Sequence, residues 1–325
     1  RYIWPYAPGW FVLVACLGGE LAALAARCRK RDAPWIPALV TGIYAGALGS
    51  KLTGAIEDLA DSCRQITQQQ VALGVWASQN LPPDARIGLN DTGAIAYFSE
   101  RKTFDVVGLT TAGEARHWVA GAGSRFEHYE RLEPQQLPTH FIVYPEWFGL
   151  PDLLGDCPTS RRVEGATILG GPLMVACTAD YHSLRSGALP GLDVGPRRLL
   201  DELDVADLES EAAHGYRLGA STAQRNVLVS FAGIADGGRS ERTAEDFQLL
   251  VEPGGLLVVR LSTSPPDGLT LTVAGRAAPP ANEAQKFTEP ASYEVPHGTP
   301  GGIQQVSLRS RTPVTVLHYW SYGPR

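Results

Sequence analysis

The amino-acid sequence predicts a membrane helical hairpin followed by a small α/β domain with a mostly parallel sheet and a C-terminal all-β, sandwich-like domain. Three observations lead to this fold class. Residues 10–26 and 34–50 are apolar segments joined by a basic turn. Strand-like and helix-like segments then alternate, and short strand-like runs between Gly and Pro clusters follow them. The predicted domains are therefore residues 1–60, 61–180 and 181–325.

The two opening segments predict transmembrane helices. Each is about 17 residues long, near the lower limit for a hydrocarbon core roughly 30 Å thick. Basic residues crowd the turn at 27–32, and acidic residues follow the second segment. Because cytoplasmic loops are enriched in Lys and Arg, we expect a cytoplasmic turn and extracytoplasmic later domains. Glu20 and Lys51 leave open the alternative of a soluble helical hairpin that packs its apolar faces on the rest of the protein.

The composition is that of folded protein. The chain has 325 residues, of which 44% are hydrophobic and 19% charged, which leaves room for two soluble domains besides the hairpin. Its formal net charge is −6, and no basic stripe lies outside the turn at 27–32, so we expect no nucleic-acid partner. The sequence begins at Arg1 without an initiator Met, and we expect it to be a piece of a longer protein.

The middle domain is predicted from alternating segments. Because parallel neighbours need crossover connections, the order strand, helix, strand, helix, strand favours a mostly parallel sheet, to which a hairpin adds antiparallel strands. Asp91 follows the first strand directly, and its carboxylate is placed to cap the first helix. The predicted strands are residues 85–89, 103–107 and 140–144, the helices are 93–98 and 111–131, and the hairpin strands are 161–169 and 172–178.

The last domain is predicted from short strand-like runs without helices between them. Gly, Pro and Asp clusters separate these runs, which is typical of a β-sandwich. The runs are residues 226–232, 247–251, 255–261, 269–274, 302–309 and 313–319.

The cysteines and histidines predict no metal site. None has the spacing of zinc ligands. Cys157 and Cys177 lie in the same later region, where they could form a disulfide if their strands are neighbours. Two unpaired buried thiols are the alternative.

Several short motifs of the first 178 residues form a recognisable set. They are N-L-P-P-D-A-R-I at 80–87, D-T-G-A-I-A-Y-F at 91–98, Arg101, F-D-V-V-G-L at 104–109, and the opening Arg1-Tyr2 with Pro5 and Pro8. This set resembles the C-terminal extracytoplasmic region of bacterial multi-pass membrane glycosyltransferases of the GT-C architecture, which use lipid-linked sugars. The resemblance covers roughly residues 1–178, and no family is identified for residues 180–325.

The resemblance implies a hexosyltransferase-like enzyme of the bacterial inner (cytoplasmic) membrane. Such an enzyme takes sugar from a polyprenyl-phosphate donor and transfers it to an extracytoplasmic glycan, lipid or protein acceptor. Its partners would be membrane lipid, the donor and the acceptor. In such enzymes the catalytic acidic loop lies far N-terminal to this region, so no catalytic residue carries over. We expect no cofactor in this part, and a divalent metal is open for the full-length enzyme.

Candidate substrate-binding residues lie where two predicted strands end. Asp91, Arg101 and Asp105 are close in sequence, at the edge where open α/β sheets commonly bind ligands, and Tyr97 offers an aromatic platform for sugar. The alternative gives these residues structural roles, with Asp91 capping a helix and Arg101 in an ion pair with Asp91 or Asp105.

Arg1 and Tyr2 complete the candidate set. With a cytoplasmic turn they would lie at the extracytoplasmic end of the first helix, where a donor phosphate would arrive, and Arg1 could bind it through a charge-assisted bond. A snorkelling interfacial arginine is the alternative.

The leading functional prediction is thus a catalytically incomplete C-terminal part of a membrane glycosyltransferase. A non-catalytic, membrane-anchored glycan- or protein-binding module is the rival, for which exposed aromatics on the sandwich would favour glycan. A soluble enzyme with a pocket around Asp91 is a third possibility.

Overall fold

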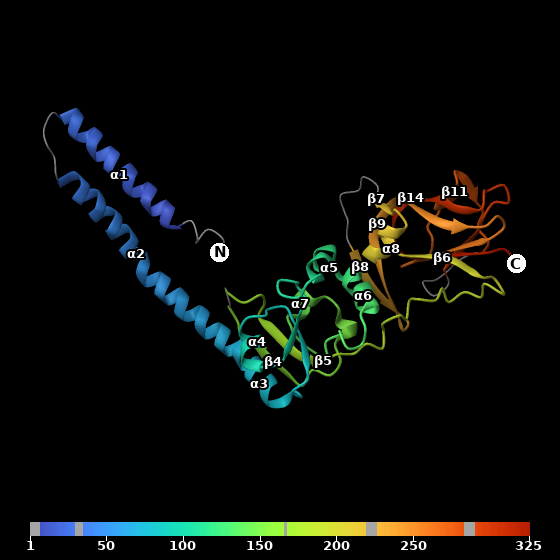
Figure 1. The fold of residues 1–325 in the computed structure, drawn as a ribbon, viewed down its shortest axis with the longest axis horizontal. Coiled ribbons are helices and arrows are strands. Elements are labelled where there is room, and N and C mark those ends of the chain that lie inside the picture. Colours follow the sequence, from blue (N-terminus) through green and yellow to red (C-terminus); the bar gives the residue numbers. More distant parts are fainter. Residues whose placement is uncertain (1–6, 30–34, 166–167, 219–225, 283–289) are drawn as a thin grey trace. The chain divides into compact units, whose positions relative to one another are not determined.

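The computed structural model describes residues 7–29, 35–165, 168–218, 226–282 and 290–325. The chain divides into two units, residues 1–65 and 66–325 (Figure 1). Each unit is described by itself below.

The first unit contains two helices. Helix α1 spans Ala7–Arg29 and helix α2 spans Trp35–Ile66. They coincide with the two apolar segments, but α2 continues well beyond the second segment. Cys16 on α1 is exposed and forms no disulfide.

The predicted membrane hairpin is wrong. Within the described residues, no helix is both long enough and apolar enough to cross a bilayer. Each apolar segment has only about 17 residues, near the lower limit for a span. Glu20 places a carboxylate inside the first segment, and α2 runs past Lys51 and Glu57 into polar sequence. The predicted inner-membrane location stays a prediction, and the structure gives it no support.

The second unit begins with a helical segment that leads into a five-stranded sheet. The π-helix Thr67–Val71 leads into helix α3 (Ala72–Asn80), which buries Leu73 and Ala77 against side chains of β1 (Arg86–Leu89) and β3 (His140–Val143). The sheet order is β2-β1-β3-β5-β4, in which β1 pairs with β2 and β3 in parallel and β5 pairs with β3 and β4 antiparallel. The sheet is mixed, not mostly parallel. The strands are β1 (Arg86–Leu89), β2 (Lys102–Asp105), β3 (His140–Val143), β4 (Thr159–Arg162) and β5 (Leu173–Thr178).

The helices of this part are shorter than predicted. The single helix expected at 111–131 is broken into two at Gly121, whose φ of 128° ends the helical backbone. The second piece, α6, buries Phe126 and Tyr129 in the core beside the sheet. The helices are α4 (Ala94–Ser99), α5 (Glu114–Ala120), α6 (Ala122–Arg131), α7 (Pro145–Phe148) and the 3₁₀ turn Pro151–Leu153.

A disulfide joins Cys157 to Cys177. Cys177 lies on β5, and Cys157 precedes β4, the strand that pairs with β5. The bond therefore closes a loop of 20 residues in sequence.

Replacing both cysteines by serine should lower the free energy of unfolding by about 3 kcal/mol, because the disulfide restricts the unfolded chain over this loop. The urea-induced unfolding transition of the second unit measures the loss of free energy. Cys16→Ser is the matched control and should leave this transition unchanged. Equal stability of the double variant and the wild type would contradict the role given to the bond.

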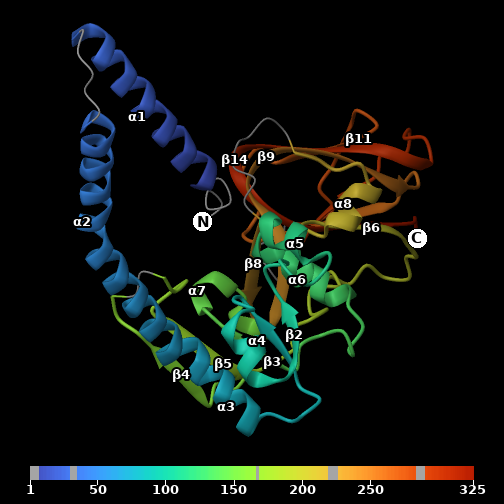
Figure 2. The ribbon, with the colours of Figure 1, turned by 60° about the vertical axis from the view of Figure 1, so that its left-hand side comes forward.

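The rest of the second unit is an antiparallel, β-rich domain. Its nine described strands form one hydrogen-bonded sheet, in which every pairing is antiparallel. The domain fits the predicted sandwich-like fold only weakly, because the long strands β9 and β14 connect the other strands into one sheet (Figure 2). The strands are β6 (Leu199–Asp204), β7 (Arg217–Leu218), β8 (Asn226–Phe231), β9 (Ile234–Val251), β10 (Leu256–Leu261), β11 (Thr270–Val273), β12 (Arg276–Ala278), β13 (Ala291–Glu294) and β14 (Gly302–Tyr322).

The core of this domain is formed by side chains of β9, β10, β11 and β14. Phe247, Val259, Val273 and Val316 are buried in it together with Tyr319. Every residue of β10 is buried, which explains its continuous apolar sequence with a single arginine, Arg260.

Helix α6 links the two sheets into one unit. Strands β8 and β9 pack against it, and Leu228 and Ala235 join the core cluster that contains Phe126 (Figure 2). Short helix α8 (Leu208–Ala213) follows β6, and Asp207 caps it by accepting hydrogen bonds from the amides of Glu209 and Ser210.

Candidate functional site

A strongly acidic cavity of about 270 Å³ lies where helix α6 meets strands β6, β9 and β14. Six carboxylates line it, together with one imidazole and two guanidinium groups. These side chains are Glu127, Glu130, Glu202, Asp204, Asp207, Asp236, His318, Arg131 and Arg185.

Glycines allow α6 to approach β8 and β9 closely enough to bring Glu127 to the cavity. A Cβ on Gly123 would lie 2.2 Å from Asn226 Oδ1 and 2.4 Å from the carbonyl oxygen of Val227. The Asn226 side chain accepts a hydrogen bond from the Ser124 amide at 2.7 Å and ties the helix to β8. On β9, the amide of Gly237 donates to Glu127 Oε1 at 2.5 Å. Glu127 is buried as a result.

Asp204 and His318 face each other across two paired strands. They are register partners on β6 and β14, and His318 Nδ1 lies 3.7 Å from Asp204 Oδ1. The imidazole stacks on Trp320, with ring centroids 4.0 Å apart. Asp204 Oδ1 and His318 Nε2 are buried, and neither atom has a hydrogen-bond partner among the described residues.

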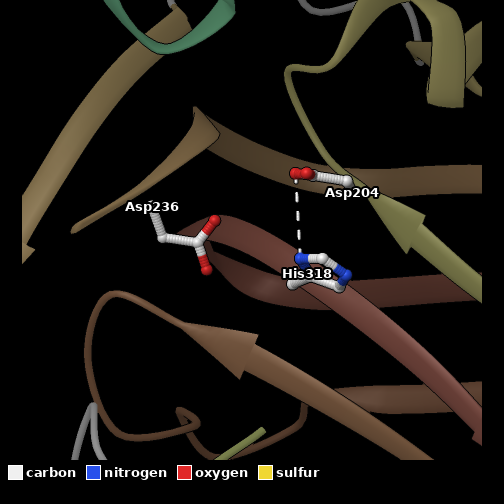
Figure 3. A group of neighbouring side chains, drawn as sticks. All are labelled: Asp204, Asp236 and His318. Atoms are coloured by element: carbon white, nitrogen blue, oxygen red, sulfur yellow. Dashed lines mark ion pairs between the residues drawn. The ribbon is translucent and has the colours of Figure 1, made fainter. Parts of the chain in front are cut away.

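Asp236 comes from the start of β9 and is held by Arg260 of β10. Arg260 Nη1 donates to Asp236 Oδ2 at 2.7 Å and to the carbonyl oxygen of Gly187 at 2.5 Å. Both members of this ion pair are buried. Figure 3 shows the carboxylates of Asp204 and Asp236 turned toward the His318 ring.

Burial and mutual repulsion keep these carboxyl groups protonated more readily than usual. Burial, with Asp204 and Asp236 nearby, raises the pKa of Glu127 well above its ordinary value. Burial and Asp236 do the same to the pKa of Asp204. Burial raises the pKa of Glu130 to about 7, and it raises the pKa of Asp236 to about 7 despite the opposing effect of Arg260. The cavity therefore brings together carboxyl groups whose ionised forms the protein compensates incompletely.

His318 has the opposite tendency. Burial and the charge of Arg260 lower its pKa well below the ordinary value. The ring is therefore neutral at neutral pH, and one of its nitrogens carries a free electron pair.

A Glu130→Gln variant should be more stable than the wild type at pH 8, and the difference should vanish below about pH 4.5. The pKa of Glu130 in the folded protein is about 7, above its ordinary value of 4.5. Between pH 4.5 and about 7, the folded protein therefore holds a proton on Glu130 that the unfolded chain has lost. The contribution of this group to wild-type stability is lost as the pH rises through that range. Urea denaturation at both pH values, in the presence of a chelator, measures the effect. Glu133→Gln, at an exposed carboxylate outside the cavity, should show no such pH-dependent difference.

The structure gives the predicted substrate-binding residues separate structural contacts. Gln70 Nε2 donates to Asp91 Oδ2 at 2.6 Å, so Asp91 binds the preceding helical segment. It does not cap α4, whose N-cap residue is Gly93 without a side-chain hydrogen bond. Tyr97 is 78% exposed and touches Phe98 edge to face.

Arg101 and Asp105 also bind backbone groups nearby. Arg101 Nη2 donates to the carbonyl oxygens of Ser78 and Leu81 at 2.7 and 2.9 Å, at the end of α3. Asp105 is fully buried and accepts hydrogen bonds from the amides of Val107 and Thr110. No ion pair joins Arg101 to either aspartate among the described residues, and the predicted Arg1 and Tyr2 lie outside those residues.

The sequence predicts none of the cavity's carboxylates, and not His318, as site residues. Their positions run from residue 127 to residue 318, and no spacing connects them. One local signal was present, the acidic run D-E-L-D-V-A-D at 201–207, which contains Asp204. Glu211, which follows this run, lies outside the cavity lining and forms an ion pair with Arg239.

Comparisons with known proteins say little about this cavity. The profile of a protein family described as a domain of unknown function (DUF8728) matches residues 64–186, which include Glu127 and Glu130 but none of the β-rich domain. No curated protein matches the chain.

One similar solved structure is described by the words "The complexity of the Ruminococcus flavefaciens cellulosome reflects an expansion in glycan recognition". The similarity covers 40% of this chain and 99% of that chain, with 11% sequence identity and a TM-score of 0.25. At that TM-score the similarity carries no argument about fold or ligand.

Proposed function

We propose that residues 66–325 act as a binding module that holds a positively charged ligand in the acidic cavity. The observation that carries the proposal is the convergence of six carboxylates on one cavity of about 270 Å³. Only two arginines accompany them there, and one of these, Arg131, already forms an ion pair with Asp207. Buried carboxyl groups whose ionised forms repel one another destabilise the empty protein, and such an arrangement is typical of a ligand site rather than of a structural core.

The arrangement of aromatic residues favours this ligand class over a glycan stacked on the β-rich domain. Tyr293, Tyr319, Trp320 and Tyr322 are all buried there. Phe231 is the one large aromatic side chain that the described part of this domain exposes widely. A row of exposed aromatics, which glycan binding on this surface would use, is therefore missing from the described strands.

The sugar-transfer function stays a prediction that rests on the sequence resemblance. Its weak substrate-binding candidates Asp91, Arg101 and Asp105 each bind groups of the protein itself. The binding of polyprenyl-phosphate donor, acceptor and membrane lipid stays a prediction in the same way.

Calorimetric titration of the full chain, stripped of metal with a chelator, tests the proposal with two classes of cation in separate experiments. Spermidine represents organic cations, and Mn²⁺, Zn²⁺ and Ca²⁺ represent divalent metals. We expect saturable binding of at least one class, weakened at least tenfold by Asp204→Asn. Asp246→Asn, at a carboxylate paired with Arg309 outside the cavity, is the control and should bind like the wild type. Absence of binding by both classes would refute the proposed function.

A further inference from the structure

We propose that the ligand of the acidic cavity is a single divalent metal ion, coordinated by Asp204, Asp236 and His318. The inference rests on the proposed function and names its ligand. Glu127 and Glu130 complete the oxygen environment on the α6 side of the ion.

The geometry of the side chains fits one ion. Single ligand atoms of Asp204, Asp236 and His318 all lie within 4.8 Å of one another (Figure 3). Metal ligands at roughly 2.0 to 2.5 Å from an ion lie about 3 to 5 Å apart, so small side-chain movements would close the coordination shell. Glu127, Glu130 and Asp204 form a second such group, and Asp204 is shared by both.

His318 is an independent indication of a ligand. The residue is 4% exposed, lies against the cavity, and leaves its Nε2 without a hydrogen-bond partner. A buried ring nitrogen that makes no hydrogen bond costs free energy unless a bound group contacts that nitrogen. Glu202 Oε2 lies 4.0 Å from Nε2, and Asp204 Oδ1 lies 3.7 Å from Nδ1, and both distances exceed a hydrogen bond. A metal ion beside Asp204 would be bound by Nδ1, the ring nitrogen that faces this carboxylate (Figure 3).

The charges around the site favour a divalent ion. Arg260 compensates the charge of Asp236. Its guanidinium also donates to the carbonyl oxygens of Gly187 and Leu189 and lies over the ring of Trp320. Asp204 and Glu127 have no cationic partner among the described residues. A divalent ion that contacts both carboxyl groups would displace their protons and offset the two negative charges that result.

The ligand types narrow the choice of ion. Carboxylate oxygens suit Mg²⁺, Ca²⁺ and Mn²⁺, whereas imidazole suits Zn²⁺ and other transition metals. A mixed set of carboxylates and one imidazole therefore favours Mn²⁺ or Zn²⁺ over Ca²⁺.

Manganese titration of the chelator-treated full chain tests the inference. The electron paramagnetic resonance signal of free Mn²⁺ reports how much ion is bound, and we expect one ion per chain with a rise in melting temperature. Asp204→Asn should weaken Mn²⁺ binding at least tenfold, and Asp246→Asn should leave it unchanged.

His318→Phe separates metal coordination from general attraction of cations. This variant keeps every carboxylate and a flat ring on Trp320, but removes both ring nitrogens. We expect it to weaken Mn²⁺ and Zn²⁺ binding at least tenfold and to leave any spermidine binding unchanged. Circular dichroism checks that each variant is folded.

Two results would overturn the inference. One is a folded wild-type protein that binds none of Mn²⁺, Zn²⁺ and Ca²⁺ saturably. The other is metal binding that both Asp204→Asn and His318→Phe leave intact. If metals fail to bind while spermidine binds through Asp204, the metal assignment is wrong and the proposed function stands. If spermidine also fails, both are wrong.

Discussion

A Gly123→Val variant is expected to lose about 3 kcal/mol or more of the free energy of unfolding. Even a single Cβ at this position would lie 2.4 Å from the carbonyl oxygen of Val227 and 3.1 Å from the amide of Gly238. Both are backbone atoms of β8 and β9, so relief requires that the strands move away from α6. Overpacking of this kind costs between about 1 and 3 kcal/mol in ordinary cores, and more where backbone must shift.

Urea denaturation followed by circular dichroism measures this loss. Because the shift would also move Glu127 away from Gly237, we expect cation binding in the acidic cavity to weaken with stability. Gly301→Ala is the control, since its Cβ would meet nothing closer than Pro253 Cδ at 3.7 Å. A Gly123→Val protein as stable as the wild type would show that α6 and the β8–β9 hairpin do not pack as described.

An Arg260→Met variant is expected to lose about 3 to 5 kcal/mol of the free energy of unfolding. Arg260 is fully buried, and its removal would leave the Asp236 carboxylate in the interior without a counter-charge. The carbonyl oxygens of Gly187 and Leu189 would lose their donor at the same time. Breaking a buried ion pair from one side costs this much because the remaining charge is uncompensated.

A double-mutant cycle with Asp236→Asn identifies the origin of the loss. Adding Asp236→Asn to Arg260→Met should recover part of the stability, since a neutral amide needs no counter-charge. The unpaired carbonyl oxygens should prevent full recovery. If the two changes add without interaction, measured by urea denaturation, the ion pair does not contribute as argued.

Local sequence patterns predicted much of the α/β part. The strands expected at 85–89 and 140–144 lie at Arg86–Leu89 and His140–Val143, because a short buried strand produces a continuous apolar run between turn residues. The sequence left open whether Cys157 and Cys177 pair, and the structure contains the bond. The two cysteines can pair only because β4 and β5 are neighbouring strands, and the distance between the cysteines in the sequence does not show that.

The first fifty residues show how hydrophobic composition can mislead. Both apolar segments are helical, as expected, but the described helices do not meet the length and apolarity of a membrane span. Helix formation depends on local propensity, whereas a span also requires an uninterrupted apolar length. Glu20 and the polar continuation of α2 after Lys51 lower the apolarity of the two helices.

Asp91 does not have the helix-capping role that its position in the sequence predicts. A short carboxylate before a helix is a good cap by sequence, yet here it accepts a hydrogen bond from Gln70. Gln70 lies 21 residues earlier in the chain, and only the tertiary structure brings its side chain close to Asp91.

The sequence by itself determined where most strands lie and that the second half is rich in β-structure, because those properties depend on neighbouring residues. It could not determine the acidic cavity. Glu127, Asp204, Asp236 and His318 belong to four elements, and the close approach of α6 at Gly123 and the register of β6 with β14 bring them together. Their burial and mutual repulsion, which distinguish a site from scattered acidic residues, are properties of that packing alone.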